Sequence, residues 1–174
     1  VGNNVLDVNT TGTANVAMGY NALGANTTDS NNTAIGHKAL EVATATQNTA
    51  CGAYALDSTT TGGYNSGFGV NALGSNTTGA SNTALGNAAL YNNTTADNNT
   101  AVGYQALNAN TTGTNNTAVG KNAVKAVTTG ERNTGVGVQA LGNTGTAVTN
   151  NTAVGVNALY ATTGSSNTAC GDAA

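Results

Sequence analysis

The chain repeats one short phrase from end to end at a nearly constant spacing. The phrase is Asn-Thr-Ala-apolar-Gly-x-x-Ala-Leu, and the stretch from Asn99 to Val119 shows it together with an Asn-Thr-Thr-Gly sequence. A fixed period over a whole chain is the signature of a repeat architecture. We therefore expect residues 1–174 to form a single repeat domain of about ten 17-residue coils. The spacing between neighbouring phrase glycines is 17 residues in most repeats, 16 or 18 in the others, and the glycines are Gly2, Gly19, Gly36, Gly52, Gly69, Gly86, Gly103, Gly120, Gly137, Gly155 and Gly171.

Two apolar columns recur in every repeat. One is the slot before the glycine, and the other is the leucine of the Ala-Leu pair, which is Val124 in one repeat. Dense Gly, Thr and Asn lower helix propensity, and the 3.6-residue period of a helix is absent. The columns predict two short strands per coil, stacked in register as an all-β, parallel β-solenoid or β-roll.

The turns between these strands have their own polar pattern. Asn-Thr-Thr-Gly sequences suit corners because Asn and Gly tolerate positive φ. An asparagine also stands ahead of each Thr-Ala strand, and stacked asparagines can hydrogen-bond from coil to coil. We expect a structural asparagine ladder formed by Asn15, Asn32, Asn48, Asn65, Asn82, Asn99, Asn116, Asn133, Asn151 and Asn167.

The alternation of side chains along a strand predicts which residues face inward. If Val102 points into the coil, Ala101 and Gly103 point out. The residues in the slot before the glycine, including Phe68, then fill the core. The threonine two residues before each of them points inward as well. The exposed Ala and Gly columns would need cover, because a thin core requires staples or association. We expect several chains to pack together, most simply three around an axis.

The two cysteines fall in the same apolar slot. Cys51 and Cys170 each precede a phrase glycine, so we expect them to act as small core residues. Seven coils at about 4.8 Å would separate them by roughly 34 Å. That is far beyond the reach of a disulfide, so the sequence predicts no bridge within the chain.

Composition excludes several classes of protein. Only 6% of the residues are charged and the formal net charge is −3, without any basic run. Nucleic-acid binding is therefore not expected. No apolar stretch approaches the roughly 18 residues that cross a bilayer, so no membrane insertion is expected.

The sequence shows no arrangement of residues for catalysis. His37 is the single histidine, and we interpret it as an exposed corner residue. It has no second histidine or acidic cluster with metal-ligand spacing beside it. Serines such as Ser58 have no plausible His and Asp partners. We predict no enzyme, no catalytic residue, no cofactor and no metal.

The repeated phrase resembles known fibre proteins. Asn-Thr-Ala-Val-Gly-x-x-Ala-Leu with Asn-Thr-Thr-Gly corners is similar to the repeat region of bacteriophage tail fibres. It is more distantly similar to the head repeats of trimeric autotransporter adhesins, whose period is shorter. The resemblance covers residues 1–174 and implies a left-handed, homotrimeric parallel β-roll on a virion or outside a cell. Both chain ends fall inside a repeat, from which we expect a segment of a longer fibre.

Three functions remain open on these grounds. The first is a structural or adhesive fibre segment, a shaft or head that touches a glycan or protein receptor, with Tyr20, Tyr91, Tyr104 and Tyr160 as candidates for surface contact. The second is ice binding through the threonine columns. The third is a self-assembling extracellular filament whose coils stack end to end.

Overall fold

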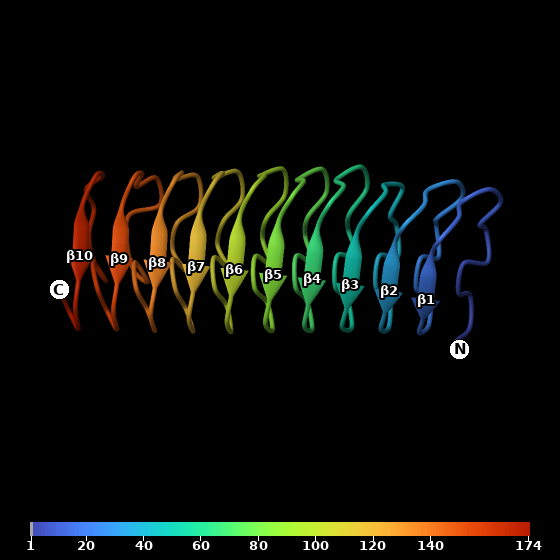
Figure 1. Ribbon diagram of the computed structural model, residues 1–174, viewed down its shortest axis with the longest axis horizontal. Helices are drawn as coiled ribbons and strands as arrows, with labels where there is room; N and C mark the ends of the chain where they lie inside the picture. Colours follow the sequence, from blue (N-terminus) through green and yellow to red (C-terminus); the bar gives the residue numbers. More distant parts are fainter. Residues whose placement is uncertain (1) are drawn as a thin grey trace.

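The protein is a rod of stacked coils. The computed structural model describes residues 2–174, and Figure 1 shows the coils side by side along the long axis with the chain ends at opposite ends of the rod. One ten-stranded sheet runs along it, in the order β1 to β10, and every neighbouring pair is parallel. The predicted all-β parallel solenoid with coils of about 17 residues is confirmed.

Each strand is three residues long and comes from the Thr-Ala-apolar part of the phrase. Equivalent residues pair across the sheet, as in Thr100↔Thr117, Ala101↔Ala118 and Val102↔Val119. The strands are β1 (Val16–Met18), β2 (Thr33–Ile35), β3 (Thr49–Cys51), β4 (Ser66–Phe68), β5 (Thr83–Leu85), β6 (Thr100–Val102), β7 (Thr117–Val119), β8 (Thr134–Val136), β9 (Thr152–Val154) and β10 (Thr168–Cys170).

The prediction of two strands per coil is wrong, because the Ala-Leu segment turns instead of extending. The leucines, and Val124 in their column, have φ between 48° and 54°, and the residue two positions before each also has positive φ. These left-handed residues bend the chain around a corner. Hydrogen bonds along the rod nevertheless continue there, since the Leu107 amide donates to the Ala123 carbonyl of the next coil at 3.0 Å.

The strand alternation is the reverse of the prediction. The alanines of the strands, such as Ala101 and Ala118, are fully buried. The apolar residues beside the glycines face outward, and Leu85 and Phe68 are 49% and 40% exposed. Phe68 is therefore not an interior residue.

The interior has room for one large side chain per coil, and leucine occupies it. From Leu23 to Leu141, with Val124 in one coil, this side chain is fully buried together with the alanine that precedes it, whereas Leu6 and Leu159 in the end coils are partly buried. A Cβ placed on Gly67 would lie 3.3 Å from Leu56 Cδ1, which shows that the strand column packs directly onto the leucine column. The inward strand position must consequently be small.

The phrase glycines let neighbouring coils approach closely. A Cβ on Gly103 would lie 2.6 Å from the carbonyl oxygen of Gly120, and the φ of Gly103 is +129°. An L side chain would meet both a backbone clash and an unfavourable backbone conformation there. The glycine column thus sets the coil spacing on which the strand register depends.

Candidate functional site: the outer sheet face and its surroundings

The outward side of the sheet presents two parallel columns, which we call the outer sheet face. One column is threonine, from Thr33 to Thr168 with Ser66 in β4, and the other is the apolar slot from Met18 to Cys170. Neither column contains a charged residue over ten strands. An uncharged apolar column along the whole length is the kind of surface that marks an interaction site.

The threonines and cysteines are therefore not where the sequence placed them. The threonines share the outward face with the apolar column, and each is half-buried or exposed. Cys51 is half-buried and Cys170 is exposed, and both are free thiols. They were expected in the core because the strand was oriented the wrong way round in the prediction.

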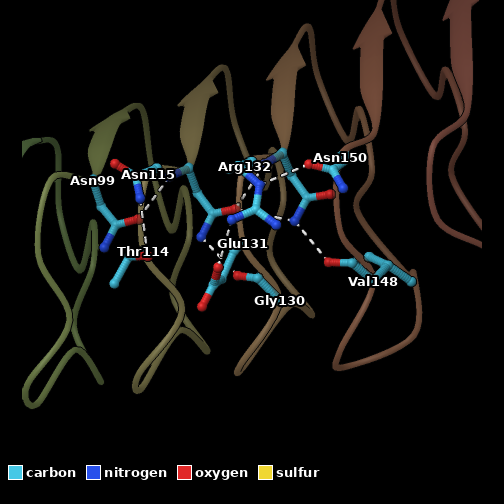
Figure 2. Close-up of polar contacts among 10 residues, drawn as sticks. Asn99, Thr114, Asn115, Gly130, Glu131, Arg132, Val148 and Asn150 are labelled. Carbon is cyan, nitrogen blue, oxygen red and sulfur yellow. Dashed lines mark hydrogen bonds and ion pairs between the residues drawn. The ribbon is translucent and has the colours of Figure 1, made fainter.

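The asparagines ahead of the strands form a continuous chain of hydrogen bonds inside the rod. From Asn32 to Asn167, each backbone amide donates a hydrogen bond to the side-chain Oδ1 of the asparagine one coil earlier, at 2.9–3.2 Å. The side-chain Nδ2 groups of Asn15 to Asn133 donate to corner carbonyls at 2.8–3.0 Å. In Figure 2 this row includes Asn99, and Val148 provides one of the corner carbonyls.

A second asparagine column lies at the other end of each corner, formed by asparagines of the Asn-Thr-Thr-Gly sequences that were predicted only to make turns. Asn93 Nδ2 donates to Asn76 Oδ1 at 2.8 Å, and Asn110 Nδ2 donates to Asn93 Oδ1 at 2.9 Å. The column is interrupted where Ala43, Thr59, Val127 and Thr144 replace asparagine. Its periodicity in Asn26, Asn76, Asn93 and Asn110 was the signal that could have revealed it.

The four candidate tyrosines lie on the surface but do not form one cluster. Tyr20, Tyr91, Tyr104 and Tyr160 are between 38% and 49% exposed. Of these four, only Tyr20 takes part in an aromatic contact among the described residues, 2–174.

His37 lies in an exposed aromatic row. Its ring stacks on Tyr20 with centroids 5.4 Å apart and meets the edge of Tyr54 at 5.0 Å. The row arises because coils are about 4.8 Å apart, so bulky rings in adjacent coils must touch.

Charged residues form small groups at the coil edges. Lys38 Nζ lies 3.2 Å from Glu41 Oε2, and the hydrogen bond to Glu41 raises the pKa of Lys38. Arg132 bridges Glu131 and Asn150 with two hydrogen bonds of 2.8 Å (Figure 2). Asp57 is half-buried, and its desolvation raises the pKa of its carboxyl above the ordinary value.

The described residues, 2–174, hold no group of three or more His, Cys, Asp or Glu side chains that could bind a metal ion. Within the same range, no helix has the length and apolar character to cross a membrane.

Comparisons with known proteins identify no relative. No family model, no curated protein and no solved structure matches this chain. The functional argument therefore depends on the geometry of the rod and its surfaces.

Proposed function

We propose that this chain is a structural or adhesive fibre segment of the tail-fibre or adhesin type, in which copies associate through the outer sheet face. The observation that carries the proposal is the exposed apolar column, which contains Met18 at 48%, Leu85 at 49% and Val154 at 41% exposure. A lone rod would leave this column in water along its whole length. Association of copies, most simply three around an axis, removes it from water.

The reason for association differs from the one that the sequence suggested. The alanines do not need cover by other chains, because each coil buries its own. The apolar column of the outer sheet face is the part that needs cover. Full burial of side chains of this size is worth about 1.5–3 kcal/mol each relative to full exposure. A face of ten such residues, already partly covered, still offers a substantial driving force.

The rod shape supports a spacer role on a virion or outside a cell. Ten strands about 4.8 Å apart span roughly 43 Å. A stack of identical coils extends by repetition, which suits a shaft that holds something at a distance.

The mass of the purified chain in solution tests the proposal. Light scattering and sedimentation are expected to give three times the mass of one chain. A mass equal to one chain at micromolar concentration would overturn it. Electron microscopy of the same sample separates short rods from fibres of indefinite length, which would point to axial filament assembly instead.

One observation favours ice binding as a second candidate. The strand threonines form one column on the outward face with a spacing of about 4.8 Å along the rod, and the apolar column runs beside it about 6.6 Å away, two residues further along each strand. A regular, uncharged array of this kind is able to order water.

Thermal hysteresis decides between the candidates. Replacing Thr117 with tyrosine disrupts the array and is expected to abolish any activity, whereas the same change at Thr112, an exposed corner residue, leaves it intact. No hysteresis in the unmodified chain eliminates ice binding.

A further inference from the structure

A column of side chains beside the buried leucines controls where grooves open on the rod. It is the residue that follows each leucine, and it is glycine in three coils: Gly24, Gly74 and Gly142. A glycine between two longer side chains leaves a slot, because its neighbours in the column lie about two coil steps, or roughly 9.6 Å, apart.

The slot at Gly74 is closed by a neighbouring ring. A Cβ on Gly74 would lie 3.0 and 3.1 Å from two ring atoms of Tyr91, so the tyrosine of the next coil lies over the glycine.

The slot at Gly142 is open although a tyrosine again follows it in the next coil. A Cβ on Gly142 would meet atoms of Gln139, the nearest at 2.8 Å, and no atom of Tyr160 is among its nearest neighbours. The structure has a groove of about 340 Å³ here, with walls that include Asn122, Lys125, Gln139, Asn143 and Tyr160. We call this groove the Gly142 slot.

The walls of the Gly142 slot combine three kinds of group. Tyr160 contributes an aromatic side chain, and the amides of Gln139 and Asn143 can each both donate and accept hydrogen bonds. Within residues 2–174, the Asn122 Oδ1 is buried and accepts no hydrogen bond, but the same is true of Asn21 Oδ1 at the Gly24 groove, so this atom does not distinguish the two grooves. Lys125 contributes a positive charge and takes part in neither of the two ion pairs found in that range.

We propose that the Gly142 slot binds a saccharide that carries a carboxylate. The C–H face of a sugar ring fits against an aromatic ring, its hydroxyls pair with amides, and a carboxylate pairs with the Lys125 ammonium. The groove at Gly24 has the opposite character, since Asp7 and Glu41 line it. An acidic sugar would be repelled there. The inference rests on the adhesive part of the proposed function and names the ligand class of that role.

The test is a titration of the intact chain with each of three probes, in which saturation-transfer NMR detects binding. The probes are a hyaluronan tetrasaccharide, which contains glucuronate, the neutral chitotetraose, and acetate as a carboxylate without a sugar. We expect hyaluronan to bind roughly tenfold more tightly than either control. Equal affinity for chitotetraose or acetate, or no binding of hyaluronan at millimolar concentration, would overturn the proposal.

Variants locate the binding within the rod. Tyr160→Ala and Lys125→Gln are each expected to weaken binding roughly tenfold, whereas Tyr91→Ala, at the closed slot, leaves it unchanged. An equal loss of affinity in the Tyr91 variant, or no loss in the Lys125 variant, would show that the saccharide does not bind in the Gly142 slot as proposed. The oligomeric mass measured on the same sample keeps a failure of binding distinct from a failure of assembly.

Discussion

Val124 and Gly135 are matched across the interior of the rod. Val124 replaces leucine in the buried column, and Gly135 replaces alanine in strand β8 opposite it. A Cβ on Gly135 would lie only 2.6 Å from Val124 Cγ2, whereas the corresponding distance from Gly67 to Leu56 Cδ1 is 3.3 Å. The branched valine takes the space that an alanine methyl group fills in other coils, so the two substitutions compensate each other.

Gly135→Ala is expected to destabilise the protein by about 1–3 kcal/mol, because valine has few rotamers with which to avoid the added methyl group. Chemical denaturation measures the change. The matched control is Gly67→Ala, which faces a leucine and is expected to change the stability by less than about 1 kcal/mol. Adding Val124→Leu to Gly135→Ala should restore most of the loss. Additive effects in the double variant would contradict the pairing.

Asn99→Ala is expected to cost about 1–3 kcal/mol, because it leaves the buried Asn116 amide without a partner and removes one of the two side-chain hydrogen bonds to the Gly113 carbonyl, which keeps the one from Asn110 Nδ2. The Asn116 amide loses Asn99 Oδ1 at 2.9 Å, and the Gly113 carbonyl loses Asn99 Nδ2 at 2.9 Å. Asn167→Ala is the control, since Asn167 is only half-buried and its side chain donates within the ladder without accepting from a following coil. Thermal unfolding of both variants compares them. Equal losses would show that the ladder hydrogen bonds do not stabilise the interior.

Asp57→Asn is expected to raise the melting temperature at neutral pH. Burial raises the pKa of the Asp57 carboxyl in the folded state above the ordinary value of 3.8, so the unfolded chain loses this proton first. The contribution of Asp57 to the free energy of unfolding therefore falls as the pH rises from about 3.8 through the folded-state pKa. Above that pKa the contribution stays at its lower value. The Asp57→Asn variant has no carboxyl at this position, so its stability does not fall for this reason. The melting temperatures of the two proteins should converge at pH 3 and separate toward pH 7; a constant difference would contradict the assignment.

If copies associate through the outer sheet face as proposed, Leu85→Glu is expected to give single chains, because it places a charge in the middle of that face. Light scattering measures the mass, and circular dichroism checks that the rod remains folded. Tyr64→Glu is the control, as Tyr64 is 62% exposed and lies on a corner outside that face. If the Leu85 variant keeps the mass of the unmodified protein, the outer sheet face is not the interface.

The fold was predictable from the repeat, but the orientation of its strand was not deduced. A 17-residue period, a constant leucine column and polar corners are sufficient to indicate stacked parallel coils. The inward and outward positions of the strand were assigned by hydrophobicity alone. Size was the better guide. The inward column contains only alanines, such as Ala34, and two glycines. The outward column contains side chains as different in size as those of Cys51 and Phe68, and a tightly stacked interior does not accommodate such a difference.

The corner at the leucines was hidden for a different reason. Leucine is rarely found at positive φ, so its type gives no hint that Leu107 has φ of 50°. The corner forms because the coil has to close around the buried side chain, which is a property of the stack. The Gly142 slot was similarly invisible, since it depends on whether the ring of the next coil lies over a glycine.

The direction of the backbone hydrogen bonds determines how such a rod responds to force. They run parallel to the long axis, coil to coil, as between Gly103 and Leu85 at 2.7 Å. Tension applied to the two chain ends therefore opens them one after another, and no set of bonds shares the load. Each released coil of about 17 residues would lengthen the molecule by roughly 50 Å. Mechanical strength in a fibre built from this unit has to come from neighbouring chains bound along its side.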